Sequence, residues 1–243
     1  MNIDRVPGLN KEFSSASAQQ VLAHVIESYS GRVTLASSLG AEDQVITHMA
    51  SQITDALDIF ILDTGRLHQE TYNLMETTSR QYAFNYRVFF PQSDAVESMV
   101  AAHGPNHFYA SVENRKQCCA ARKVEPLGRA LNGYSAWVTG IRRAQSMDRT
   151  LVNCFEWDVA HSAIKVNPLY KWRKDDVWNY IKRHDVPYNP LHDQHYPSIG
   201  CAPCTRAVKP GEDDRSGRWW WEASVKKECG LHVTGIKTDN PND

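Results

Sequence analysis

The sequence has no stretch that could cross a membrane. No run of apolar residues approaches the roughly 18 that a spanning helix needs, although 42% of the 243 residues are hydrophobic. The N-terminus also lacks the basic and then apolar pattern of a secretory signal. We therefore expect a cytoplasmic protein with an ordinary core and no membrane partner.

The sequence also has almost no excess charge. Its 27 Lys and Arg residues nearly balance its 28 Asp and Glu residues, which leaves a formal net charge of −1 at pH 7. Proteins that bind nucleic acid through their overall field carry a clear basic excess. We expect no nucleic-acid partner, and the length fits one large α/β domain or a domain with an appendage.

We also expect no disulfides, because in a reducing compartment cysteines more often bind metals or take part in catalysis than form disulfides. Cys118 and Cys119 are adjacent, and together with Cys201-Ala-Pro-Cys204 they supply four thiolates. Neighbouring cysteines form a strained disulfide but are good soft ligands. A structural zinc ion and a four-iron cluster both fit this set. A thioredoxin-like redox pair at Cys201 and Cys204 is an alternative, but the pair follows a loop rather than a strand.

The other two cysteines have different surroundings. Cys154 has no partner at metal-ligand spacing, so we interpret it as a buried thiol. Cys229 lies in a polar tail after Lys226 and Lys227 and three residues before His232. These neighbours favour the thiolate, which is the attacking form. The alternative is a surface thiol with no role.

Three apolar segments end abruptly in polar residues, which is typical of parallel strands facing a ligand. The segment 32–37 is followed by Ser38, Gly40 and Asp43, a strand–turn–helix layout that can cradle phosphate. The Gly-Lys-Ser/Thr ending of a Walker motif is absent, and a plain strand–helix turn is the alternative. The segment 57–62 ends similarly, before Asp63 and Thr64.

The third segment, 136–140, is followed by Arg142, Arg143 and Arg149. The planar guanidinium suits phosphate and sulfate, so anion binding is favoured over solvated side chains. Helical periodicity predicts further elements, and we expect the N-terminal 13 residues to be loose and a helix to open at the cysteine pair, over about 117–131. The charged and aromatic segment 211–221 predicts either a lid or a surface loop.

Several motifs resemble those of the assimilatory adenylyl-sulfate (APS) reductases, which are relatives of the phosphoadenylyl-sulfate (PAPS) reductases. The resemblance extends over about 32–232, and its motifs are Cys118-Cys119 with Arg122-Lys123-Val-Glu-Pro-Leu, Cys201-x-x-Cys204, Glu228-Cys229-Gly-Leu-His232, Thr139-Gly-Ile-Arg-Arg and Leu62-Asp-Thr-Gly.

The resemblance implies an α/β fold of the adenine-nucleotide α-hydrolase (ATP-pyrophosphatase) type, with a mostly parallel sheet flanked by helices and a mobile C-terminal tail. Residues 1–210 would form the nucleotide-binding domain with a [4Fe-4S] cluster, in place of zinc. Residues 211–243 would form a lid and a tail carrying the nucleophile. Thioredoxin would be the electron donor, and APS would yield sulfite and AMP through an S-sulfocysteine.

The resemblance also implies roles for particular residues. The cluster ligands would be Cys118, Cys119, Cys201 and Cys204, and the catalytic residues Cys229, His232 and Lys123. The substrate would be bound by Ser37, Ser38, Gly40, Asp43, Leu62, Gly140, Arg149, Arg215 and Arg218. The tail continues to residue 243, past a motif that usually lies close to the C-terminus.

Other functions stay open at this point. One is PAPS reduction, although PAPS reductases often lack the paired cysteines. Another is an ATP-pyrophosphatase or tRNA-thiolating enzyme, but these favour Ser-Gly-Gly-x-Asp-Ser, whereas residues 37–43 read Ser-Ser-Leu-Gly-Ala-Glu-Asp. A zinc-stabilised binding module would need no catalysis. The sequence leaves open whether the chain forms a homo-oligomer.

Overall fold

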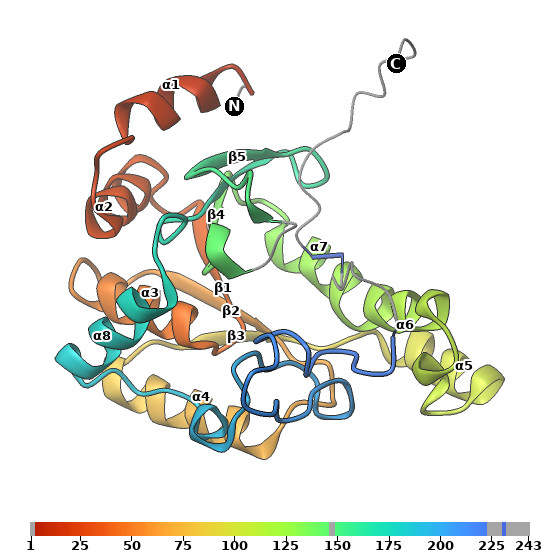
Figure 1. The fold of residues 1–243 in the computed structure, drawn as a ribbon. Coiled ribbons are helices and arrows are strands. Elements are labelled where there is room, and N and C mark those ends of the chain that lie inside the picture. The colour runs from red at the N-terminus through yellow and green to blue at the C-terminus, as the bar shows by residue number, and fades with distance from the viewer. Residues whose placement is uncertain (1–2, 146–148, 223–229, 232–243) are drawn as a thin grey trace, which may run out of the picture.

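The computed structural model describes residues 3–145, 149–222 and 230–231, and its centre is a six-stranded sheet (Figure 1). The strand order is β3-β2-β1-β4-β6-β5, and β5 alone runs antiparallel to its neighbour. The predicted α/β class with a mostly parallel sheet is therefore confirmed. The strands are β1 (Val33–Ser37), β2 (Asp58–Leu62), β3 (Tyr86–Phe89), β4 (Ala136–Val138), β5 (Phe155–Asp158) and β6 (Ala163–Val166).

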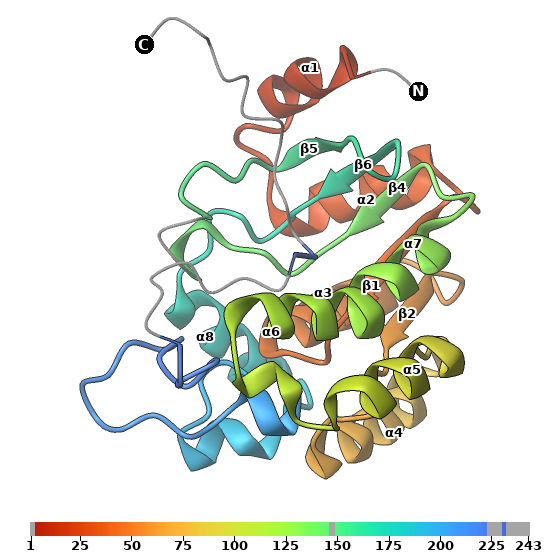
Figure 2. The same cartoon turned by 90° about the vertical axis from the view of Figure 1, so that its right-hand side faces the viewer.

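Helices cover both faces of this sheet (Figures 1 and 2). In the described residues the α-helices are α1 (Arg5–Glu12), α2 (Ala18–Ser28), α3 (Ala41–Ser51), α4 (Gln69–Tyr82), α5 (Ser93–His103), α6 (Val112–Cys119), α7 (Glu125–Leu131) and α8 (Lys174–His184). No helix in the described part of the chain has the length and apolar character needed to cross a bilayer.

Successive side chains along a strand point to opposite faces of the sheet, so one strand can contribute to the hydrophobic clusters on both faces. On β4, Ala136 and Val138 belong to the cluster that includes α2, α3 and α8, whereas Trp137 belongs to the cluster with α7. On β2, Ile59 and Phe60 divide in the same way. This follows from the two-residue period of a strand, so the apolar strands read from the sequence are buried on both faces.

The N-terminal segment differs from the prediction of a loose end, because residues 5–12 form α1. The Asn10 amide accepts a hydrogen bond from the Phe155 backbone N–H at 3.0 Å and donates one to its carbonyl at 2.8 Å. Since β5 is an edge strand with unpaired backbone groups, the side chain of Asn10 replaces a missing neighbour and holds α1 in place.

The cysteine helix also differs, because Cys118 and Cys119 end α6 instead of opening a helix. A π-helical segment, η2 (Ala120–Val124), follows and continues directly into α7. Pro126 lies in the first turn of α7 and cannot donate a bond to the carbonyl four residues earlier. This explains the wider turn, and such π-segments are frequent at functional sites.

The sheet has one point where its strand order reverses, between β1 and β4. The chain runs from β1 outward to β2 and β3, and then returns to the other side of β1 with β4. In open parallel sheets, ligands bind beyond the carboxyl ends of the strands at such a point. The proposed division after residue 210 stays a prediction, although Thr205 and Arg218 form a β-bridge across it.

Candidate functional site

A cavity of about 350 Å³ lies at this reversal point, which is within the usual size of small-molecule sites. It is lined by every one of the predicted substrate residues in the described chain, together with Lys123: Ser37, Ser38, Gly40, Asp43, Leu62, Gly140, Arg149, Arg215 and Arg218. The structure brings them together, and their individual roles stay predictions. Cys229 and His232 lie outside the described residues, but Leu231 between them lines the cavity.

The turn after β1 is held by the carboxylate of Asp43. This carboxylate accepts hydrogen bonds from the backbone N–H and hydroxyl of Ser38, at 2.7 and 2.6 Å. Leu39 has a φ of +58°, a conformation that is uncommon outside glycine. The turn leads into α3, whose N-terminus begins after Gly40. Backbone N–H groups at such a terminus favour an anion.

Asp43 is itself almost completely buried, at 7% exposure. Burial raises the pKa of its carboxyl to about 6, against the opposing effect of the Ser38 hydrogen bonds. Gly140 lies so close that a Cβ there would meet Asp43 Oδ1 at 2.4 Å and the Asp43 backbone nitrogen at 3.2 Å. The end of β4 therefore needs glycine to approach the start of α3.

The three arginines after β4 differ in their contacts. Arg142 is buried and forms an ion pair with Glu42 at 2.7 Å. Arg143 donates to Val152 O and to Asn153 Oδ1 and is absent from the described cavity lining. Both guanidinium groups are thus engaged with the protein. Arg149 donates to Gln145 Oε1, and both Arg142 and Arg149 line the cavity, so position supports the expected anion-binding role for these two.

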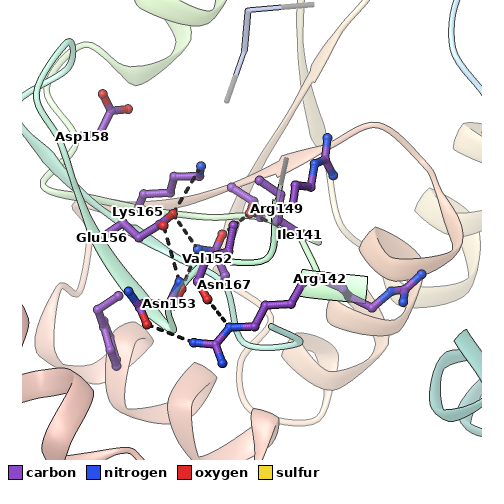
Figure 3. A network of polar contacts seen from close by, with 12 residues as sticks. Ile141, Arg142, Arg149, Val152, Asn153, Glu156, Asp158, Lys165 and Asn167 are labelled. Carbon is purple, nitrogen blue, oxygen red and sulfur yellow. Dashed lines mark hydrogen bonds and ion pairs between the residues drawn. The ribbon is translucent and has the colours of Figure 1, made fainter. Parts of the chain in front are cut away.

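A polar network in Figure 3 was not predicted from the sequence. Lys165, only 4% exposed, lies 3.5 Å from Glu156, and Asn167 donates to the same carboxylate at 3.0 Å. Burial lowers the pKa of Lys165, while Glu156 opposes this effect. Its ammonium group also lies 5.7 Å from the ring of Trp137, a residue of the cavity wall. A lysine within the apolar run 163–166 was the available signal.

A second cavity adjoins the first and is lined by all four paired cysteines, Cys118, Cys119, Cys201 and Cys204. The end of β2 links the two cysteine pairs. The Thr64 hydroxyl lies 3.2 Å from Cys201 Sγ, and Arg122 donates to the Thr64 carbonyl at 2.7 Å. The backbone N–H of Ala202 donates to the Arg66 carbonyl at 2.8 Å.

Positive side chains surround these thiols, and the cavity lining contains Arg66, Arg115, Arg122, Lys123 and Arg218. Burial acts to raise the pKa of the Cys201 thiol, but Lys123, the Thr64 hydrogen bond and two arginines together outweigh it, so the pKa is lowered. Burial raises the pKa of Cys204 to about 12, with a contribution from Cys201. The cations offset the negative charge that several thiolates would bring together.

The arrangement of the thiols bears on the metal they could hold. Within the described residues, no three His, Cys, Asp or Glu side chains gather closely enough for a single ion. A zinc ion binds four thiolates at about 2.3 Å from one centre, whereas a four-iron cluster takes one thiolate at each corner. The four thiols that line this cavity match the number of donors that a four-iron cluster takes.

The two cavities share part of their lining, namely Lys123, Arg218 and Trp219. The Arg218 side chain passes close to Gly200, where a Cβ would lie only 2.4 Å from Arg218 Nη2, so a glycine at position 200 leaves room for Arg218 between the two cavities. Cys154 lies elsewhere, at 1% exposure, and burial raises its pKa to about 12, as expected for an inert thiol. His192 lines the first cavity.

Known proteins share this architecture. Residues 32–207 match the phosphoadenosine phosphosulfate reductase domain. The chain belongs to the phosphoadenosine phosphosulfate reductase family. It is 54% identical to a protein of Burkholderia cepacia named adenosine 5'-phosphosulfate reductase, over 84% of this chain and 82% of that one. A protein of the same name from Allochromatium vinosum is 49% identical over 89% and 84%. The resemblance drawn from the motifs is confirmed, and the protein is an enzyme of this family.

Solved structures agree on the fold. A PAPS reductase from Candida auris, crystallised as a phosphate complex, superposes with a TM-score of 0.73 at 27% identity, over 86% of this chain and 98% of that one. An FMN adenylyltransferase from Candida glabrata, in complex with ATP, has a TM-score of 0.56 at 16% identity, over 87% and 70%. This second likeness shows the fold alone.

Proposed function

We propose that this enzyme reduces APS to sulfite and AMP, in sulfate assimilation in the cytoplasm, with thioredoxin as the electron donor. The observation that carries the proposal is the pair of adjoining cavities. One is lined by the residues expected to bind the nucleotide, the other by four cysteines, and Lys123 and Arg218 belong to both. The names of the curated relatives support the choice of substrate.

The reaction begins with the thiolate of Cys229 attacking the sulfur of APS. A bond forms between the two sulfur atoms, the bond from sulfur to the phosphate oxygen breaks, and AMP leaves with the electron pair. Lys123 and the cavity arginines offset the charge on the sulfate oxygens. Leu231, two residues past Cys229, packs against the cluster that contains Trp137, which supports a tail that reaches this cavity.

The second step needs an external thiol. A thiol of reduced thioredoxin attacks Cys229 Sγ, sulfite leaves with two electrons, and the second thioredoxin thiol resolves the mixed disulfide. The five described cysteines are free thiols, and neither residue adjoining Cys229 is a cysteine. This absence of a neighbouring cysteine supports an external donor.

We also propose that Cys118, Cys119, Cys201 and Cys204 hold a [4Fe-4S] cluster. The four thiols around one cavity and the cations that line it support this choice. When bound, the cluster supplies a buried charge beside Lys123 and joins α6 to the loop of Cys201. An iron and sulfide count on protein purified anaerobically tests the proposal, and stoichiometric zinc without iron would contradict it.

PAPS reduction is the second candidate, because the matching domain carries that name. The paired cysteines and the names of the relatives favour APS. Comparing kcat/KM for the two substrates decides between them, and equal values or a preference for PAPS would overturn our choice.

The test of the mechanism uses APS without reductant. One AMP per active site should be released, and the peptide carrying Cys229 should gain the mass of one SO₃ group. Reduced thioredoxin should then remove this mass as sulfite. The Cys229→Ser variant should lose both steps and keep its iron. An adduct on Cys154 or on a paired cysteine would contradict the assignment.

A further inference from the structure

A buried ion pair joins the cysteine helix to the segment that precedes Cys229. Arg115 donates to both carboxylate oxygens of Glu222, from Nε to Oε1 at 2.8 Å and from Nη2 to Oε2 at 3.0 Å. The two side chains are only 1% and 2% exposed. A two-pronged pair of this kind fixes distance and orientation together.

The surroundings of the pair tie it to the second cavity. Arg115 lies one helical turn before Cys119 on α6, and both line that cavity. The Arg115 guanidinium also stacks on the ring of Trp219 at 4.5 Å, and the backbone N–H of Glu222 donates to the Trp219 carbonyl at 2.9 Å. In Figure 1 the dark blue segment that leads up to residue 222 runs beside α6. Residues 219–222 are thus held against the cysteine helix.

This attachment limits where Cys229 can go. Cys229 lies seven positions after Glu222 in the sequence, and an extended chain of that length spans at most roughly 25 Å. A short tether of this kind gives its end an effective concentration in the millimolar range. Trp219, at the start of the attachment, lines both cavities, so the tether begins beside the site.

The attachment is also stronger than the contact beyond Cys229. Leu231 is a single, partly buried side chain against the Trp137 cluster, and such a contact changes an equilibrium by roughly tenfold. Breaking one side of a buried ion pair changes an equilibrium by a hundredfold or more. The chain can therefore release Leu231 while Glu222 stays attached to Arg115.

We propose that Arg115 and Glu222 are positioning residues for the reaction, which fix the base of the segment that carries the nucleophile. The inference rests on the proposed role of Cys229. It assigns to the pair neither substrate contact nor metal ligation. It explains why two charges are buried where an apolar pair would pack more cheaply.

The test compares two variants of the holoenzyme. Glu222→Gln keeps the shape of the side chain but not its charge, and Glu222→Ala removes the contact, while both leave Arg115 in the lining of the cysteine cavity. A misplacement of about 1 Å can cost roughly a hundredfold in rate. We expect sulfonation of Cys229 by APS, measured in a single turnover, to slow at least tenfold in both variants. The affinity for AMP and the iron content should stay within twofold.

A second readout does not depend on activity. Trypsin should cut after Lys226 or Lys227 at least tenfold faster in both variants, because the segment has lost its attachment. The control is Glu76→Gln, which removes the exposed pair with Arg80 and should change neither readout. Wild-type rates of both sulfonation and cleavage would overturn the proposal. A parallel loss of AMP binding and iron would show a merely structural role and would also overturn it.

These readouts distinguish the proposed role of Arg115 and Glu222 from the proposed function, on which it rests. If the wild-type enzyme gains no adduct on Cys229, the proposed function fails. Faster tryptic cleavage in the variants would then still support the attachment, and unchanged cleavage would reject it.

Discussion

The two adjoining cavities are built in different ways. The nucleotide cavity is formed largely by chain segments that directly follow β1, β2 and β4, so its position follows from the order of the strands. The cysteine cavity joins residues 118–119 to residues 201–204, which are far apart in the sequence and meet beside Thr64. One site is a product of sheet topology, and the other depends on long-range packing between a helix end and a loop.

The difference predicts unequal tolerance to substitution. The position of the nucleotide cavity is set by the backbone at the strand ends, so we expect it to survive the loss of one side chain. We expect the cysteine cavity to depend on each thiol, because its halves come from distant segments that meet through contacts such as the hydrogen bond from Ala202 to Arg66. The predictions below test this contrast, from the largest expected effect to the smallest.

Cys201→Ser should have the largest effect. Cys201 is 9% exposed and lies against the Thr64 hydroxyl, and serine is a poor ligand for iron. We expect loss of iron and of APS reduction to below one thousandth of the wild-type rate. The matched control is Cys154→Ser, which should keep the iron. Equal iron content in the two variants, measured after anaerobic purification, would contradict the assignment of the ligands.

The same contrast explains what the sequence could predict. The strand ends at Ser37, Leu62 and Gly140 were found from hydrophobic patterns, because a parallel sheet brings its carboxyl ends to one edge. The pairing of the cysteines came from residue chemistry and resemblance. Partners such as Glu222 for Arg115 and Glu42 for Arg142 could not be found, since an ion pair between residues about a hundred positions apart leaves no local pattern.

The prediction of secondary structure from the sequence was wrong at α1 and at the start of α6, for related reasons. The helix α1 was missed because its stability depends on Asn10 binding to β5, a tertiary contact. The start of α6 was missed because its residues are mostly polar, with Arg115 and Cys119 buried among them. Long-range packing decided both elements, and local propensity was a weak guide.

Lys123→Met should have the second largest effect, because this residue lines both cavities. Removing a positive group that offsets transition-state charge typically costs a hundredfold to a thousandfold in kcat. The comparison variant is Arg122→Met, whose parent residue lines the cysteine cavity but is absent from the described lining of the other. We expect Lys123→Met to lower kcat per bound iron, and Arg122→Met, which removes the hydrogen bond to the Thr64 carbonyl, to lower the iron content with little change in kcat per bound iron. Steady-state kinetics and iron assays check both, and the reverse pattern would refute the shared position of Lys123.

Asp43→Asn should change how stability depends on pH. The carboxyl pKa is about 6 in the folded protein and 3.8 in the reference state, so keeping it ionised costs about 3 kcal/mol above pH 7. This cost is relieved as pH falls from about 7 to 4. The gain in unfolding free energy from Asp43→Asn should therefore be larger at pH 8 than at pH 5, as measured by urea denaturation.

Asp58→Asn is the matched control with the opposite sign. Burial acts to raise the pKa of Asp58, but the hydrogen bonds from Arg87 and Tyr134 outweigh it, so the pKa is lowered. The ionised carboxylate then stabilises the fold above the unfolded pKa, and this stability is lost as pH falls through the folded one. Asp58→Asn should destabilise the protein more at pH 8 than at low pH. The same trend in both variants would contradict our account of Asp43.

The smallest effects should come from two glycines with contrasting surroundings. A Cβ at Gly140 would meet Asp43 and the Cβ of Glu42, at 2.4 and 2.8 Å, whereas a Cβ at Gly128, within α7, meets nothing within 4 Å. Gly140→Ala should lower the unfolding free energy by about 1–3 kcal/mol and weaken AMP binding, because α3 and β4 must move apart. Gly128→Ala should raise it by roughly 0.5–1 kcal/mol, since alanine loses less entropy in a helix. If both substitutions change stability in the same direction, Gly140 is not required for the close approach of α3 to the end of β4. The backbone at the strand ends would then not set the position of the nucleotide cavity.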